Sequence, residues 1–209
     1  MERRYTEAVQ IDPSSTEVRN IYKLLIGAVV PRPIAFVSSL SSDGVPNLAP
    51  FSFFTVVSAN PPVICFSPMN RTSGDPHKDT RRNIEATREF VVNVVSEEFA
   101  GPMNLCSGEY PPEVDEFVVS GLTPIPSVRV HPARVAESHV QMECRLLQVV
   151  PVSERPLGGC LVLGEVLLFH VDESILENFI IDADRLRAIG RMGGPTYART
   201  TDRFNLQRP

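Results

Sequence analysis

The chain has 209 residues, of which 43% are hydrophobic, so it can bury the core of one domain of ordinary upper size. Its formal net charge of −5 and its lack of a dense Lys/Arg cluster argue against a nucleic-acid-binding face. The longest candidate membrane run, residues 24–30, is far below the roughly 20 residues that a spanning helix needs, and the first residues lack a signal-peptide core.

The four cysteines contain no Cys-x-x-Cys pair, and three of them lie in apolar, strand-like runs. Cysteine in such runs commonly behaves as a small hydrophobic residue. We therefore expect neither disulfides nor a metal site, and a protein of the reducing cytoplasm that is not associated with a membrane.

A helix is expected from about residue 14 to Ala28, because apolar residues recur at three- and four-residue spacing from Val18 onward. Ser14 and Glu17 have the spacing of a capping box, and two prolines shortly after Ala28 end the helix.

Short strands separated by breakers dominate the rest of the chain. We expect strands at 33–40, 45–57, 62–67, 90–95, 133–152 and 161–171, and short helices at 78–87 and 97–106. Strands without alternating long helices favour an antiparallel barrel over a doubly wound sheet. The prediction is a mainly β single domain over residues 1–209, with a core at about 20–175 and a C-terminal extension at 176–209.

The segment around Asp43-Gly44 is the most informative part of the sequence. Asp-Gly between two apolar runs is a strong hairpin signal. Asn47 and Ser52 then stand beside several phenylalanines, a mixture that suits a flat, partly polar ligand. The alternative is a hairpin whose polar residues serve only the turn, and the residues alone do not decide between the two.

Common catalytic motifs are absent from the sequence. It contains neither Gly-x-Gly-x-x-Gly nor Gly-x-Ser-x-Gly, and its four histidines lack metal-like spacing. His77 could approach a phosphate, whereas His139 and His170 are expected to be structural. Arg32 is either structural or reaches a bound ligand.

Residues 31–54 resemble the signature of the flavin reductase-like, FMN-binding split-barrel family, especially its flavoredoxin-like branch. The resemblance continues, in order, through 57–62, 78–80, 83–84, 89–94 and the Gly-Glu-Val at 164–166. It covers roughly residues 20–195.

The resemblance implies an antiparallel split β-barrel of the Greek-key type with a few peripheral helices. It also implies a homodimer with FMN near its interface, and NAD(P)H-dependent reduction of flavin or of a downstream acceptor. A monooxygenase or an electron-acceptor protein is then a possible partner. One alternative is an FMN-containing electron carrier reduced by a protein donor; another is a non-redox binding module.

The resemblance also assigns residues to the flavin. The family's ring-contacting strands correspond to Ser38, Ser39, Asn47, Ala49, Pro50, Phe51 and Ser52, and the expected phosphate contacts are Ser67, Lys78, Thr80 and, more distantly, Arg191. No catalytic acid–base pair is expected, because the flavin itself carries the chemistry. Where many relatives have Gly-Asp-His, this chain has Gly158-Gly159-Cys160, which weakens the case for direct NAD(P)H oxidation more than that for flavin binding.

Overall fold

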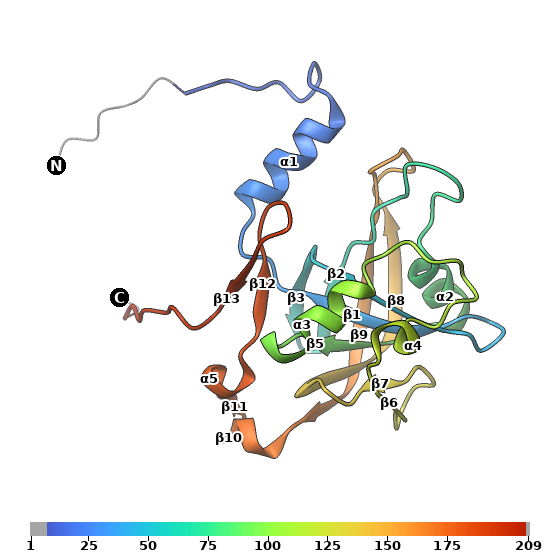
Figure 1. The fold of residues 1–209 in the computed structure, drawn as a ribbon, viewed down its shortest axis with the longest axis vertical. Coiled ribbons are helices and arrows are strands. Elements are labelled where there is room, and N and C mark those ends of the chain that lie inside the picture. The colour runs from blue at the N-terminus through green and yellow to red at the C-terminus, as the bar shows by residue number, and fades with distance from the viewer. Residues whose placement is uncertain (1–7, 208–209) are drawn as a thin grey trace.

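Seven strands form one antiparallel sheet in the computed structural model, which describes residues 8–207 (Figure 1). The hydrogen-bonded order is β2-β1-β5-β8-β9-β4-β3. The strands are β1 (Ala35–Leu40), β2 (Pro46–Phe51), β3 (Phe54–Ala59), β4 (Pro62–Phe66), β5 (Glu89–Val94), β8 (Val140–Pro151) and β9 (Cys160–Val171).

The two edge strands, β2 and β3, follow each other in the chain and are joined only by Ser52 and Phe53. Two residues span a few ångströms, so the sheet must curl until its edges lie next to each other. Yet β2 and β3 stand at opposite ends of the hydrogen-bonded order, so the barrel stays open along this line, called the seam below. The mainly β split barrel expected from the sequence is confirmed.

Five α-helices and several short elements surround the sheet in the described part of the chain. The helices are α1 (Val18–Ala28), α2 (Asp79–Thr87), α3 (Ala100–Leu105), α4 (Glu116–Ser120) and α5 (Ala183–Leu186), with 3₁₀ turns η1 (Glu97–Phe99) and η2 (Glu173–Ile175). The short strands are β6 (Pro124–Ile125), β7 (Arg134–Val135), β10 (Leu176–Glu177), β11 (Ile180–Ile181), β12 (Ile189–Arg191) and β13 (Tyr197–Arg199). None of the helices between residues 8 and 207 is long and apolar enough to cross a membrane.

Three sequence expectations were wrong in detail. The expected strand at 45–57 is two strands, because the bend at Ser52-Phe53 carries the chain from one edge of the barrel to the other. The expected strand at 133–152 is interrupted around Ser138, whose hydroxyl bonds the carbonyls of Val94 and Val140 at 2.8 Å. Helix α1 starts after Glu17 without a side-chain cap, so the capping box does not form.

The sheet packs a hydrophobic cluster on each face. Along β1 the side chains alternate: Val37 joins the cluster inside the barrel, whereas Phe36 joins the one beneath α3 and α4. Inside the barrel, Phe90 packs so closely on β9 that a Cβ atom at Gly164 would lie 2.3 Å from its ring. Glycine at this position of the Gly-Glu-Val motif is therefore required by packing.

Helix α1 stands away from the barrel and buries none of its residues (Figure 1). Arg32 ties its C-terminal end to the body. The guanidinium donates to the carbonyls of Ile26 and Val29, both at 2.7 Å, and to that of Met192 at 3.0 Å. Its Nε also lies 3.3 Å from the Ser52 hydroxyl. Arg32 is therefore a structural strut between α1, the C-terminal hairpin and the seam.

Candidate functional site

A groove follows the seam. It consists of three cavities of about 90, 200 and 180 Å³ that share Pro50 as a lining residue. A larger cavity of about 630 Å³ continues it past Phe53, with Ser52 and Ser67 shared between the two. We call the first cavity the polar end, the cavity of 630 Å³ the apolar end, and the whole the seam groove.

The floor of the seam groove offers unused backbone donors. Among residues 8–207, the amides of Ser52 and Phe53 donate to no protein acceptor. They are free because the seam interrupts the ladder at this bend. A planar ligand with acceptors along one edge would give these donors the partners that a closed barrel would have supplied.

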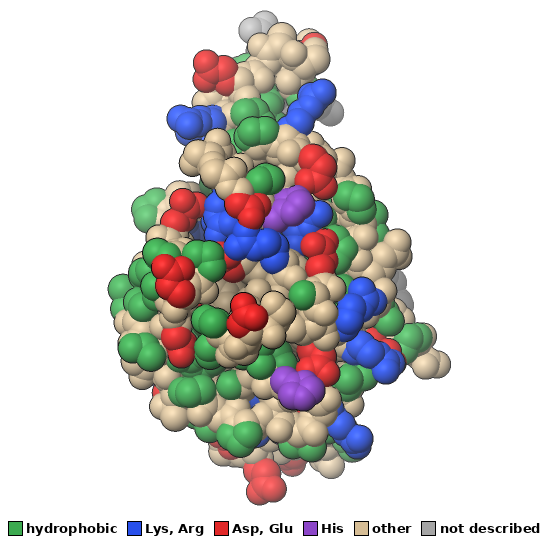
Figure 2. Space-filling model, turned by 90° about the vertical axis from the view of Figure 1, so that its right-hand side faces the viewer, with side chains coloured by type: hydrophobic (Ala, Val, Ile, Leu, Met, Phe, Trp, Pro, Cys, Tyr) green, Lys and Arg blue, Asp and Glu red, His purple; other side chains and the backbone are tan. Residues whose placement is uncertain are grey.

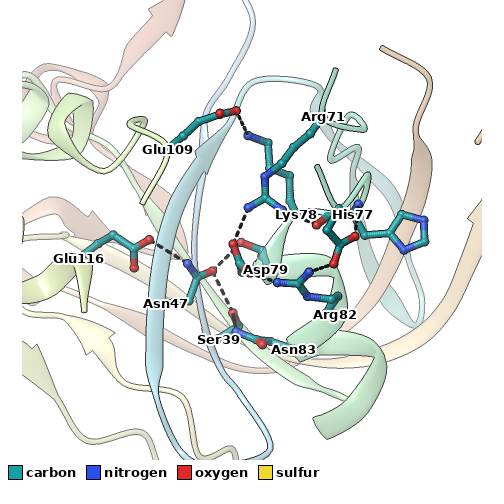
Figure 3. Close-up of polar contacts among 12 residues, drawn as sticks. Ser39, Asn47, Arg71, His77, Lys78, Asp79, Arg82, Asn83, Glu109 and Glu116 are labelled. Carbon is teal, nitrogen blue, oxygen red and sulfur yellow. Dashed lines mark hydrogen bonds and ion pairs between the residues drawn. The ribbon is translucent and has the colours of Figure 1, made fainter. Parts of the chain in front are cut away.

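Cationic groups gather at the polar end (Figure 3). Lys78 Nζ lies 3.2 Å from Glu109 Oε1, and Arg71 Nη2 lies 2.5 Å from Asp79 Oδ2. Arg82 also pairs with Asp79, so two guanidinium groups share that carboxylate. Figure 2, which looks onto the side where α2 lies, shows Lys and Arg side chains gathered with acidic side chains at their margin.

The N-terminus of α2 opens at this end of the groove. Lys78 is its N-cap residue and makes no side-chain capping bond, so the first-turn amides are free of side-chain partners. Free amides and the helix dipole attract an anion, and Lys78 and Arg71 add charge to the same place. This donor set suits a phosphate group.

A buried hydrogen-bond network backs the polar end (Figure 3). The amide nitrogen of Asn47 donates to Glu116 Oε1 at 2.9 Å, and its oxygen accepts from the Thr80 hydroxyl at 2.6 Å. Ser39 accepts from the amide of Asn83 at 3.2 Å. Because the Thr80 hydroxyl donates its proton to Asn47, we expect Thr80 to offer an anion its backbone amide and not its side chain.

Glu116 holds β2 as well as Asn47. Its second carboxylate oxygen accepts from the backbone amide of Leu48 at 2.9 Å. Burial raises the pKa of Glu116, and the bonds from Leu48 and Asn47 partly offset that rise. The carboxylate thus fixes the strand that carries the groove-lining residues Ala49 and Pro50.

The apolar end lies between α1, β3 and β9. Leu25 of α1 and Val29 just after it, together with Phe53, Phe54 and Leu161, give it a mostly apolar lining. The guanidinium carbon of Arg32 lies 5.9 Å from the centre of the Phe53 ring. The seam groove therefore changes along its length from a charged end, where Lys78 and Arg71 lie beside acidic side chains, to an aromatic end.

The structure brings most of the sequence-predicted site residues to the seam groove. Those that line it are Asn47, Ala49, Pro50, Phe51, Ser52, Ser67, Lys78, Thr80 and Arg191. Ser38 and Ser39 do not: both are buried, and the Ser38 hydroxyl donates to the carbonyl of Ala133. Arg191 lines the third cavity, whereas Lys78 lines the first two, so the structure does not bring these two expected phosphate contacts into one cavity.

Sequence reasoning missed Arg71, Tyr22 and Ser107, which also line the seam groove. Arg71 had a usable signal, because it is a second cation in the loop that precedes Lys78. Tyr22 and Ser107 had none, since only the tertiary fold brings α1 and the end of α3 to the seam.

The cysteine and histidine side chains have other surroundings. All four cysteines are free thiols. Cys160, which occupies the place of the missing histidine, is fully buried in the barrel core, and burial raises its pKa. Cys106 lines the polar end, where burial raises the pKa of its thiol to about 11. His77 pairs with Glu154 at 2.8 Å, and His170 pairs with the buried Glu143 at 2.6 Å.

Known proteins are similar to this chain in fold and in sequence. A family model described as "Flavin reductase like domain" matches residues 27–190. Nitrilotriacetate monooxygenase component B from Bacillus cereus is 37% identical, with a TM-score of 0.91 over 96% of this chain and 100% of its own. The 2-nitrobenzoate 2-nitroreductase NbaA from Pseudomonas fluorescens is 32% identical, with a TM-score of 0.86 over 96% of each chain. Flavoredoxin from Desulfovibrio vulgaris (Miyazaki F), at 21% identity and a TM-score of 0.71 over 85% of this chain and 91% of its own, shares the fold.

Proposed function

Since this chain belongs to the flavin reductase-like family, we propose that it binds FMN in the seam groove and uses NAD(P)H to reduce flavin or a downstream acceptor. The observation that carries the proposal is the change along the groove, from an end where Lys78, Arg71 and the N-terminus of α2 meet to an aromatic end at Phe53. FMN matches this arrangement, because it has an anionic phosphate at one end and a flat aromatic ring at the other.

Each part of the groove has a task in this proposal. Lys78, Arg71 and the first amides of α2 hold the phosphate. The free amides of Ser52 and Phe53 donate to the polar edge of the ring. Bound flavin supplies the hydride and electron-transfer chemistry, so the protein needs only to bind, orient and partly cover it.

The visible absorption spectrum of the purified protein tests flavin binding directly. We expect a flavin band, or its appearance when FMN is added. Anaerobic mixing with NADH or NADPH then separates two activities. Rapid bleaching of the band supports the reductase, and a band that bleaches only with a protein donor supports an FMN electron carrier. A colourless protein that fails to bind FMN would refute both and favour a non-redox binding module.

The electron carrier stays a candidate because of one specific observation. The chain replaces the family's Gly-Asp-His run with Gly158-Gly159-Cys160, and the Cys160 thiol points into the core. No side chain at this position can therefore serve the nicotinamide. The reductase remains the preferred function because the third cavity, of about 180 Å³, leaves room beside the flavin ring for one further ring, such as the nicotinamide of NAD(P)H.

A homodimer is part of the proposal. Leu25 of α1 is 52% exposed and Val56 on edge strand β3 is 69% exposed, and α1 also borders the apolar end of the groove. A second copy that covers α1 and β3 would bury these apolar side chains and protect the unpaired edge. It would also close the groove over the flavin ring.

Light scattering tests the dimer against the 23.1 kDa chain mass. We expect about twice that mass, and expect Leu25→Asp to give monomers that lose FMN. Asn20→Asp, on the same helix, is the matched control and should stay dimeric. A wild-type monomer with full FMN occupancy would refute the dimer and the shared site.

The electrons of reduced flavin must pass to an acceptor. The similarity to a monooxygenase component B supports a monooxygenase as the partner that consumes it, and an electron-acceptor protein is the other candidate. The four free thiols fit a reducing cytoplasm.

A further inference from the structure

Arg191 lies on β12 and lines the third cavity of the seam groove. The β12–β13 hairpin lies beside α1 (Figure 1). The cavity has a volume of about 180 Å³. Its lining includes Tyr22 from α1, Pro50 and Ser52 from the seam, Ser107 after α3, and Arg191 and Tyr197 from the hairpin. Arg191 is the one formally charged residue among the residues that line it.

The fold holds Arg191 in place. Its backbone exchanges two hydrogen bonds with Arg32, at 2.8 and 2.9 Å, which join the hairpin to the chain leading into β1. Its guanidinium carbon lies 4.5 Å from the centre of the Tyr197 ring. The Tyr197 hydroxyl bonds Asn104 Oδ1 at 3.1 Å, so the ring is anchored as well. A guanidinium ordered in advance loses little freedom when it binds a ligand.

The charge of Arg191 is uncompensated. Within residues 8–207, its side chain makes no ion pair and no hydrogen bond. Two other arginines of the same C-terminal segment do have a carboxylate, because Arg187 and Arg199 pair with Glu97 at 2.7 and 2.5 Å. The neighbouring Arg32 has only carbonyl and hydroxyl partners. Two adjacent guanidinium groups without a carboxylate create a positive potential.

We propose that this cavity is a binding subsite for a small organic anion, an aromatic carboxylate whose carboxylate group pairs with Arg191. Guanidinium binds carboxylate through two parallel hydrogen bonds, and the tyrosines at 22 and 197 provide aromatic surface for a ring. The small volume holds one ring and not a whole dinucleotide. Because Pro50 and Ser52 also line the flavin's part of the groove, the anion lies beside the flavin, as an acceptor would; this part of the inference rests on the proposed function.

The test uses 4-fluorobenzoate as the probe, followed by fluorine NMR with the full-length protein, both without FMN and at saturating FMN. We expect wild-type protein to bind 4-fluorobenzoate and to bind the neutral 4-fluorobenzyl alcohol about tenfold more weakly or worse. Arg191→Gln should weaken the binding of 4-fluorobenzoate by a similar factor, and Arg191→Lys should weaken it less. Arg199→Gln removes an exposed arginine from the same hairpin and should bind the probe as wild type does.

Three results would overturn the inference: equal binding of the acid and the alcohol, unchanged acid binding by a folded Arg191→Gln protein, or loss of FMN affinity in that variant with riboflavin affinity retained. The last result would make Arg191 a phosphate contact. Thermal unfolding checks that the variant is folded, and Arg191→Lys replaces it if it is not. Arg191-dependent binding of the probe to a protein that binds no flavin would refute the proposed function and leave the anion subsite standing.

Discussion

Removal of the Lys78 ammonium group tests where the flavin phosphate binds. Lys78→Ala should weaken the binding of FMN but not that of riboflavin, which lacks the phosphate. A hydrogen bond to a charged group contributes roughly 1.5–3 kcal/mol, so we expect FMN affinity to fall about ten- to a hundredfold. Titration of the variant with each flavin, followed by quenching of flavin fluorescence, measures the difference.

The ion pair between Lys78 and Glu109 sets a second, smaller effect. The two side chains lie 3.2 Å apart, and the Glu109 side chain is 71% exposed. Such a surface pair is worth about 0–1 kcal/mol, and the phosphate must displace it. Glu109→Gln should therefore tighten FMN by up to about fivefold and leave riboflavin unchanged.

The double variant completes the test. Once Lys78 is Ala, Glu109→Gln should improve FMN affinity less than it does in wild-type protein, because the carboxylate no longer competes for the ammonium group. Equal losses for FMN and riboflavin in Lys78→Ala would show that Lys78 supports the fold of the groove and does not contact phosphate.

Other predictions concern stability and the thiols. Gly164→Ala places a Cβ atom 2.3 Å from Phe90 and should lower the free energy of unfolding by roughly 1–3 kcal/mol, whereas Gly101→Ala, with nothing within 4 Å of its Cβ, should not; equal denaturation midpoints would contradict this packing. Because the folded pKa of Glu116 is raised, its stabilising contribution should be complete below its ordinary value of 4.5 and be lost as pH rises through the folded value. Denaturation of wild type and Glu116→Gln across that pH range should show that the free energy of unfolding of wild type falls relative to that of the variant as pH rises. Parallel curves of unfolding free energy against pH would argue against this effect. Cys160→Ala should keep the flavin spectrum and the rate of reduction with lower stability, since the thiol is buried in the core; loss of reduction with FMN still bound would give Cys160 a catalytic role.

Local sequence patterns predicted the strands but not their breaks. Alternation and β-branched residues gave β1, β4, β5 and β9 to within about two residues at each end. The bend at Ser52-Phe53 was not predicted, because its cause is topological. It joins the two edges of one curled sheet, and no local propensity distinguishes such a bend from a continuing strand.

The sequence indicated several groove-lining residues where one segment carries them. Asn47, Pro50 and Lys78 line the groove as expected. Ser38 and Ser39 do not line the groove, because a polar residue in a strand can serve the protein's own hydrogen bonds as readily as a ligand's, and here both do. Alternation fixes which side chains share a face, but not which face the ligand uses.

The position of the groove follows from the order of the strands. A sheet edge exposes unpaired amides and carbonyls, and proteins usually cover such edges or pair them. Here the two edges meet at a two-residue bend without pairing, so within residues 8–207 the amides of Ser52 and Phe53 have no acceptor from the strands of the sheet. The Arg32 guanidinium ties this bend to α1 and to the C-terminal hairpin, through its hydrogen bonds with Ser52, Ile26 and Met192. Truncation of Arg32 to Ala should therefore weaken FMN and riboflavin equally, in contrast to Lys78→Ala. A selective loss of FMN would show that Arg32 contacts the phosphate and does not act as a strut.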